Sequence, residues 1–183
     1  MSLLLPVDSY RGLSSWQAHI NRSTPSSEPG TDLYVPIGTH IHAPDDGYIW
    51  GSGESIGPAT GRWVGINFDN GMSFRSMHHS RNRITAGRVT RGDLIAFSGA
   101  SGYGEEDWSW NVAETGGAHV HITLWPTHDH RYGYKSPGVP YTIDFMQHVA
   151  GAAGGDSRPF PINTPKEYPD MRLIKLTKDG ATT

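Results

Sequence analysis

Two histidines lie two residues apart in the apolar segment 119–125, at His119 and His121. The segment reads as a β-strand, in which residues i and i+2 point to the same face of a sheet. The two imidazoles are therefore expected side by side, with Val120 and Ile122 on the opposite face. Imidazole is a common zinc ligand and the commonest general acid or base near neutral pH. One ring could hold a metal while the other faces a substrate; alternatively, both merely lie on a half-exposed strand.

Further candidate ligands and bases lie at three other points of the chain. They are Asp32 at the start of a predicted strand, His78 with His79 at the end of a hairpin strand, and the segment 28–32 with His19 upstream. A catalytic zinc site takes three protein ligands and leaves one position for water. Two histidines and one carboxylate are a standard set for peptide hydrolysis, because the metal lowers the pKa of its bound water. The chain has no cysteine, so any metal must be held by His, Asp or Glu.

Composition and charge narrow the class of protein. The chain has 183 residues, enough for one domain with a substantial core. Its formal net charge of −3 gives no case for a nucleic-acid partner. No apolar stretch is long enough to span a bilayer, and residues 1–6 lack the basic flank and apolar core of a signal peptide. We expect no membrane or nucleic-acid partner, and a monomer.

The elements that must position these side chains are mostly short strands. The chain contains 23 glycines, 13 prolines and six tryptophans, a composition typical of strands separated by turns. Segment 63–77 predicts a β-hairpin around the turn 69–71. We therefore predict a mainly β fold, a compact antiparallel β-sheet with long loops on one side.

Helical spacing occurs only late in the chain, at 142–150. Thr142 could cap this helix and Gly151 would end it. Residues 1–31 are expected to be mostly loop. We predict one domain over residues 1–151, followed at 152–183 by a linker and tail. That tail either packs back on the domain or begins a further module.

Several motifs resemble, in order and rough spacing, those of the lysostaphin-type (LytM-like) zinc endopeptidases. They are Gly30-Thr31-Asp32, 35–39, 43–47, 77–80, 89–93, 98–102 and His119-Val120-His121. The resemblance covers roughly residues 12–150. It implies an antiparallel β core of the duplicated-hybrid-motif kind, with a groove that binds one zinc ion through a His, an Asp and the second His of H-x-H. It also implies cleavage of peptide cross-links or stems in bacterial peptidoglycan.

The resemblance also assigns roles to individual residues. Asp32 and His121 correspond to zinc ligands, and His78 and His119 to the two catalytic histidines beside the open position. His79 falls where the family usually has an apolar residue, and we expect it to be a solvent-facing neighbour.

The chain departs from the family at the first ligand, which normally precedes the Asp by four residues. Here that place is Glu28. Either Glu28 binds zinc directly, or His19 reaches the metal with the Ser/Pro-rich segment between them looped out. We favour His19, because segment 16–22 resembles phage-borne members with a His and an Arg upstream of such a turn. The predicted ligands are thus His19, Asp32 and His121; loss of the metal is a third alternative.

The function predicted from this resemblance is a zinc endopeptidase of bacterial peptidoglycan. The source would be a bacteriophage: an antimicrobial endolysin released from the host cytoplasm at lysis, or a lysin carried on a virion. The alternative is a non-catalytic wall-binding or structural virion domain with a degenerate metal site.

Other residues leave less specific expectations. His40 and His42 share a strand face and are expected to be structural. Tyr103, Trp108 and Trp110 precede the H-x-H strand. They could form a groove wall that stacks on peptide or sugar, or equally a small satellite core.

Overall fold

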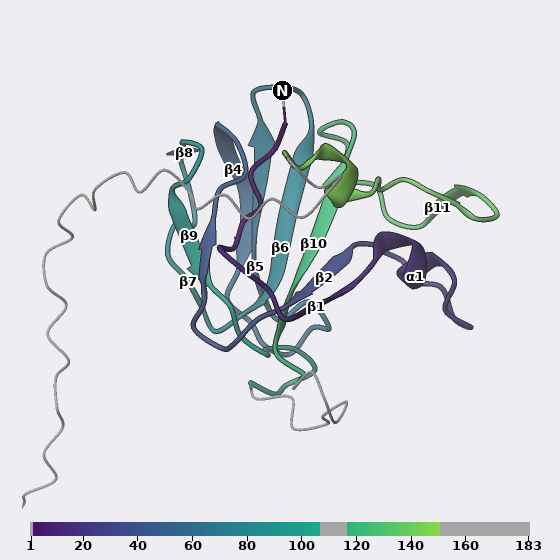
Figure 1. Ribbon diagram of the computed structural model, residues 1–183, viewed down its shortest axis with the longest axis horizontal. Coiled ribbons are helices and arrows are strands. Elements are labelled where there is room, and N and C mark those ends of the chain that lie inside the picture. The colour runs from purple at the N-terminus through teal and green to yellow at the C-terminus, as the bar shows by residue number, and fades with distance from the viewer. Residues whose placement is uncertain (1, 107–116, 151–183) are drawn as a thin grey trace, which may run out of the picture.

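A computed structural model describes residues 2–106 and 117–150 (Figure 1). Its largest element is a seven-stranded sheet whose ladders are all antiparallel. In spatial order the strands are β1 (Gly12–Ser14), β2 (Thr31–Tyr34), β10 (His119–Trp125), β6 (Ser73–His79), β5 (Arg62–Phe68), β4 (Gly47–Gly53) and β8 (Arg88–Val89).

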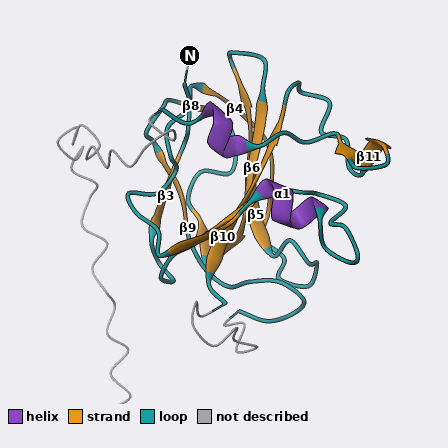
Figure 2. Cartoon of the chain, turned by 45° about the vertical axis from the view of Figure 1, so that its right-hand side comes forward, coloured by secondary structure: helices purple, strands orange, loops and turns teal. Residues whose placement is uncertain are grey.

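Two smaller antiparallel sheets complete the strand content of the described residues. One consists of β3 (His40–His42), β9 (Leu94–Phe97) and β7 (Arg81–Asn82). The other is the hairpin of β11 (Tyr134–Ser136) and β12 (Val139–Pro140), which projects away from the large sheet in Figure 1. Figure 2 shows how little of the described chain is helical: α1 (Trp16–Ile20) and the 3₁₀ turn η1 (Phe145–His148). The predicted mainly β, antiparallel fold is confirmed.

The hydrophobic core lies between the seven-stranded and three-stranded sheets. Val120, Ile122 and Leu124 of β10 are fully buried in the same cluster as Ile41 of β3 and Ile95 of β9. The alternating side chains of β10 therefore form the other face of the large sheet. This is the face expected to carry the two histidines of the H-x-H motif.

The hairpin predicted at 63–77 is confirmed. β5 and β6 pair with Asn67 opposite Ser73, and Phe68 closes the turn by donating its N–H to the carbonyl of Met72 at 2.9 Å. Gly71 has φ of 92° in this turn, a conformation that only glycine adopts without strain. The hairpin carries β6 back beside β10, and His78 is the second-to-last residue of β6.

The predicted helix over 142–150 is largely wrong. Only the 3₁₀ turn η1 forms, and its N-cap is Asp144, whose carboxylate accepts from the N–H of Met146 at 3.0 Å. Thr142 instead accepts a hydrogen bond from the indole of Trp16 at 3.0 Å. Ile143 donates its N–H to Leu124 at 2.9 Å, so the chain is still tied to the sheet where the helix was expected to begin. The predicted tail at 152–183 lies outside the described residues.

None of the helices in residues 2–106 and 117–150 combines the length and apolar character needed to cross a membrane.

His79 lies in the interior, so the prediction of a solvent-facing side chain is wrong. It is fully buried, its Nδ1 donates to Asn82 Oδ1 at 2.7 Å, and its Nε2 accepts from the Ser76 hydroxyl at 2.9 Å. Burial lowers the pKa of His79 to about 4, although the hydrogen bond to Asn82 opposes this shift. The neutral ring is thus part of the folded structure.

Acidification is expected to destabilise the protein through His79. Between pH 6.5 and about 4 this imidazole binds a proton in the unfolded chain but not in the folded one. The stabilising effect of the neutral ring is therefore complete above pH 6.5 and is lost as pH falls toward 4. Lowering the pH from 7 to 5 should therefore reduce the free energy of unfolding by about 2 kcal/mol through His79 alone. Urea denaturation of wild type and His79→Gln at both pH values measures the difference.

The control for this experiment is His40→Gln, because His40 is exposed on β3. We expect His40→Gln to keep the pH dependence of wild type and His79→Gln to show a shallower one. Equal slopes in all three proteins would contradict the role given to His79.

Candidate metal centre

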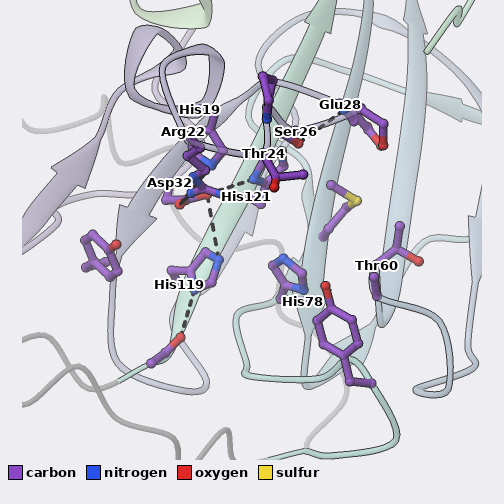
Figure 3. Close-up of a pocket in the computed structure, with 17 residues that line it drawn as sticks. His19, Arg22, Thr24, Ser26, Glu28, Asp32, Thr60, His78, His119 and His121 are labelled. Carbon is purple, nitrogen blue, oxygen red and sulfur yellow. Dashed lines mark hydrogen bonds and ion pairs between the residues drawn. The ribbon is translucent and has the colours of Figure 1, made fainter. Parts of the chain in front are cut away.

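Five predicted site residues line one cavity of about 630 Å³ (Figure 3). They are His19, Asp32, His78, His119 and His121. Antiparallel pairing places β2 and β6 on either side of β10, with His121 directly opposite both Asp32 and Met77. Directly paired residues share a sheet face, so the strand register itself brings the carboxylate beside the H-x-H motif. The structure thus joins parts of the chain 89 residues apart.

Asp32 lies between two imidazoles, and the three buried side chains could hold a metal ion. His19 Nε2 is 3.1 Å from Asp32 Oδ2, and His121 Nδ1 is 2.7 Å from Asp32 Oδ1. One ligand atom from each residue can be chosen so that all three lie within 4.8 Å of one another. A tetrahedral zinc site with bonds of 2.0–2.1 Å separates its ligand atoms by roughly 3.3 Å. The donor set and spacing therefore fit zinc; the ligand assignment itself remains a prediction.

His19 reaches this point because of the short helix α1. The Ser15 side chain caps the helix by accepting from the N–H of Ala18 at 3.1 Å. His19 Nδ1 lies 3.0 Å from the Ser15 carbonyl oxygen, which turns Nε2 toward Asp32. The loop after the helix folds back on it, because the N–H of Ser26 donates to the His19 carbonyl at 3.2 Å. Sequence analysis missed this helix, although Ser15 was a possible N-cap.

Gly30 allows the start of β2 to approach β10 closely. A Cβ atom at Gly30 would lie 2.3 Å from the Ile122 carbonyl oxygen and 2.4 Å from His121 Nε2. Any side chain here would displace the His121 ring or the strand, so glycine is needed for the positions of Asp32 and His121.

The Asp32 carboxylate is held in its ionised form. Burial alone would raise the pKa of Asp32, but hydrogen bonds from His121 and His19 outweigh it and lower that pKa well below its ordinary value. A buried, permanently charged carboxylate flanked by imidazoles suits a divalent cation.

His78 and His119 lie beside this cluster, with ring centroids 4.7 Å apart. His78 Nδ1 donates to the Ser101 carbonyl at 3.0 Å, and His119 Nδ1 donates to the Gly117 carbonyl at 2.8 Å. In the neutral rings these bonds leave Nε2 as the basic nitrogen. Burial lowers the pKa of both histidines, partly opposed at His119 by the Asp32 charge. His78 has φ of 66°, an uncommon backbone conformation that often marks functional positions.

Glu28 lines the cavity, but its carboxylate is bound by Arg75. Arg75 Nε donates to Glu28 Oε1 at 3.0 Å, and Arg75 Nη2 contacts Oε2. The guanidinium also faces the rings of Trp63 and Tyr132, at 5.1 and 5.4 Å from their centroids. Of the two alternatives for the first ligand, the geometry therefore favours His19. Sequence analysis missed Arg75, which no local pattern links to Glu28.

The aromatic residues predicted before β10 are only partly described. Tyr103 lines the cavity and is 68% exposed, which suits a groove wall better than a satellite core. Trp108 and Trp110 lie outside the described residues. His40 and His42 do not line the cavity, and His42 Nδ1 donates to the Gly92 carbonyl at 2.9 Å.

Several solved structures have a similar fold. A zinc-containing peptidase from Vibrio cholerae has a TM-score of 0.54 and 22% identity, covering 80% of this chain and 40% of that one. Csd3 from Helicobacter pylori has a TM-score of 0.51 and 18% identity, covering 81% and 35%. The catalytic domain of lysostaphin from Staphylococcus simulans has a TM-score of 0.46 and 22% identity, covering 64% and 75%. The protein thus spans less than half of the first two chains, and at these identities the likeness concerns the fold.

No curated protein matches the sequence. The family model of Peptidase family M23 matches residues 26–132, more than half of the chain. The matched range includes Asp32, His78, His119 and His121 and begins after His19. With the antiparallel β core and the His/Asp/His cluster, this match shows that the chain belongs to peptidase family M23.

Proposed function

We propose that the protein is a zinc-dependent endopeptidase that cleaves peptide bonds in bacterial peptidoglycan. The observation that carries this proposal is the convergence of His19, Asp32 and His121 within one cavity, with His78 and His119 beside them. The substrate class follows from the resemblance to lysostaphin-type enzymes. The similarity of segment 16–22 to phage-borne members further supports a phage lysin that acts at host lysis or from the virion.

The chemistry follows from the positions of these side chains. A zinc ion bound there would polarise the scissile carbonyl and lower the pKa of an attacking water molecule. His19, Asp32 and His121 would hold the ion and leave one position open. The basic Nε2 atoms of His78 and His119 would accept the proton of the attacking water and return it to the leaving amine. Their Nδ1 bonds to backbone carbonyls keep both rings in the required tautomer.

The alternative, a non-catalytic wall-binding domain, was motivated by Glu28 at the usual ligand position. The pairing of Glu28 with Arg75 and the approach of His19 to Asp32 support the catalytic function instead, because His19 could take the place of the missing ligand.

The test is digestion of purified peptidoglycan. We expect new amino groups to appear without new reducing sugars, because a peptide bond and not a glycosidic bond is hydrolysed. A chelator such as 1,10-phenanthroline should abolish the release, and added zinc should restore it. Absence of new amino groups, or release that persists after complete removal of zinc, would contradict the proposal.

A further inference from the structure

We propose that Arg22 binds a carboxylate group of the substrate next to the scissile bond, so that the site prefers anionic peptides. This inference rests on the proposed peptidase function.

Arg22 lines the cavity just after the helix that carries His19. It directly follows Asn21, the C-cap residue of that helix. Its Nη2 lies 3.7 Å from Asp32 Oδ2, and its side chain is 50% exposed. In Figure 3 Arg22 lies beside His19 and Asp32, within the group that lines the cavity. A substrate at the metal centre would therefore pass within reach of the guanidinium.

Arg22 is the only Lys or Arg among the described residues that line the cavity. Among the described residues that line it, only Arg22, Glu28 and Asp32 carry a formal charge with the histidines neutral. Glu28 is paired with Arg75, and Asp32 contacts His19, His119 and His121 as well as Arg22.

The contact between Arg22 and Asp32 does not use the guanidinium fully. A distance of 3.7 Å exceeds that of an N–H···O hydrogen bond, so the pair is held by charge alone. A guanidinium has five N–H donors in a planar fork that matches a carboxylate in two parallel bonds. A divalent cation on Asp32 would further weaken its attraction for Arg22. The fork is then best satisfied by a carboxylate brought in by the substrate.

Stem peptides of peptidoglycan offer two such groups, the α-carboxylate of a γ-linked glutamate and the C-terminal carboxylate. Four synthetic stem peptides, each group free or amidated, separate these sources. For wild type we expect higher kcat/KM when the recognised carboxylate is free. Arg22→Gln should lower this preference roughly 10-fold or more, mainly through KM, because a charge-assisted bidentate bond is lost. Arg22→Lys should give an intermediate preference, since the charge remains but the fork does not.

The matched control is Arg88→Gln. Arg88 has a similarly exposed side chain, at 45%, and it pairs with Asp69. It belongs to β8, which lies at the opposite edge of the large sheet from β1. It should keep the preference of wild type. A loss in Arg22→Gln that is equal for all four peptides would overturn the proposal, because it would place Arg22 in support of Asp32 or of the reacting carbonyl. If Arg22→Gln keeps the wild-type preference for free over amidated peptides, the proposal is also overturned.

Calorimetric titration of the four peptides into wild type, Arg22→Gln and Arg88→Gln gives a second readout. If wild type cleaves none of the peptides, the proposed function has failed on these substrates, while the binding preference still decides the role of Arg22. Tighter binding of the free carboxylate by wild type, reduced in Arg22→Gln, supports the proposal. Equal binding of free and amidated peptides by wild type overturns it.

Discussion

Replacing Asp32 with asparagine is expected to remove bound zinc and to lower kcat/KM on peptidoglycan by roughly 10³-fold or more. The carboxylate lies between His19 Nε2 and His121 Nδ1, at 3.1 and 2.7 Å, so it supplies the charge of the site and the contact common to both rings. An amide of the same shape keeps the packing but loses the charge that favours a divalent cation. Metal content by mass spectrometry and kcat/KM from amine release measure the two effects.

The matched control for this variant is Asp45→Asn. Asp45 is also nearly buried, at 9% exposure, and its carboxylate accepts from Asn70 at 2.9 Å and lies 3.7 Å from Arg91, outside the cavity. It should keep its zinc and most of its activity. Thermal unfolding with and without zinc provides a further check, because only a protein that binds the metal in its folded state is stabilised by it. Full zinc occupancy in Asp32→Asn would contradict the predicted ligand set.

The face of the sheet that carries the site could be predicted from the sequence because its signals are local. The alternation of residues 119–125 gives the strand and puts His119 and His121 on one face, and the turn at 69–71 gives the hairpin that ends at His78. The family motifs then relate Asp32 to His121. The strand register, with these two residues paired directly, agrees with that expectation.

The remaining features depend on contacts that no local pattern encodes. Helix α1 has five residues, too few to show a recognisable periodic pattern of apolar residues, yet it carries His19 to Asp32. The helix expected at 142–150 is shortened because Ile143 is still bonded to β10. The prediction of a solvent-facing His79 is wrong because Ser76 and Asn82 satisfy its ring in the interior, and neither contact can be recognised from the sequence.

The pair of Glu28 and Arg75 links the missing family ligand to the stability of the fold. Their contact ties β6 to the loop that leads through Gly30 to Asp32, although the two partners are 47 positions apart in the sequence. Both side chains are nearly buried, at 10% and 5% exposure. A carboxylate with both oxygens bound by one guanidinium is a poor metal ligand, but it fixes the loop from which β2 begins. Glu28 thus helps to position Asp32, while His19 is the residue predicted to supply the nitrogen ligand.

Arg75→Met is expected to lower the free energy of unfolding by about 3–5 kcal/mol, because it leaves the Glu28 charge buried without a partner. The double variant Arg75→Met/Glu28→Gln should recover much of this loss, since no uncompensated charge remains. Urea denaturation at pH 7 measures both. The control is Arg88→Met, which breaks the exposed pair with Asp69 and should change the free energy of unfolding far less, because water screens that pair.

The double variant also tests the link to the site. If the pair positions the loop before β2, the double variant should regain stability but bind zinc more weakly than wild type, because the loop is no longer tied to β6. Recovery of both stability and zinc affinity would mean that the pair only compensates a buried charge. An exposed ion pair contributes little to stability because water screens it. If Arg75→Met lost no more stability than Arg88→Met, the claim that Glu28 is left as an unpaired buried charge would be contradicted.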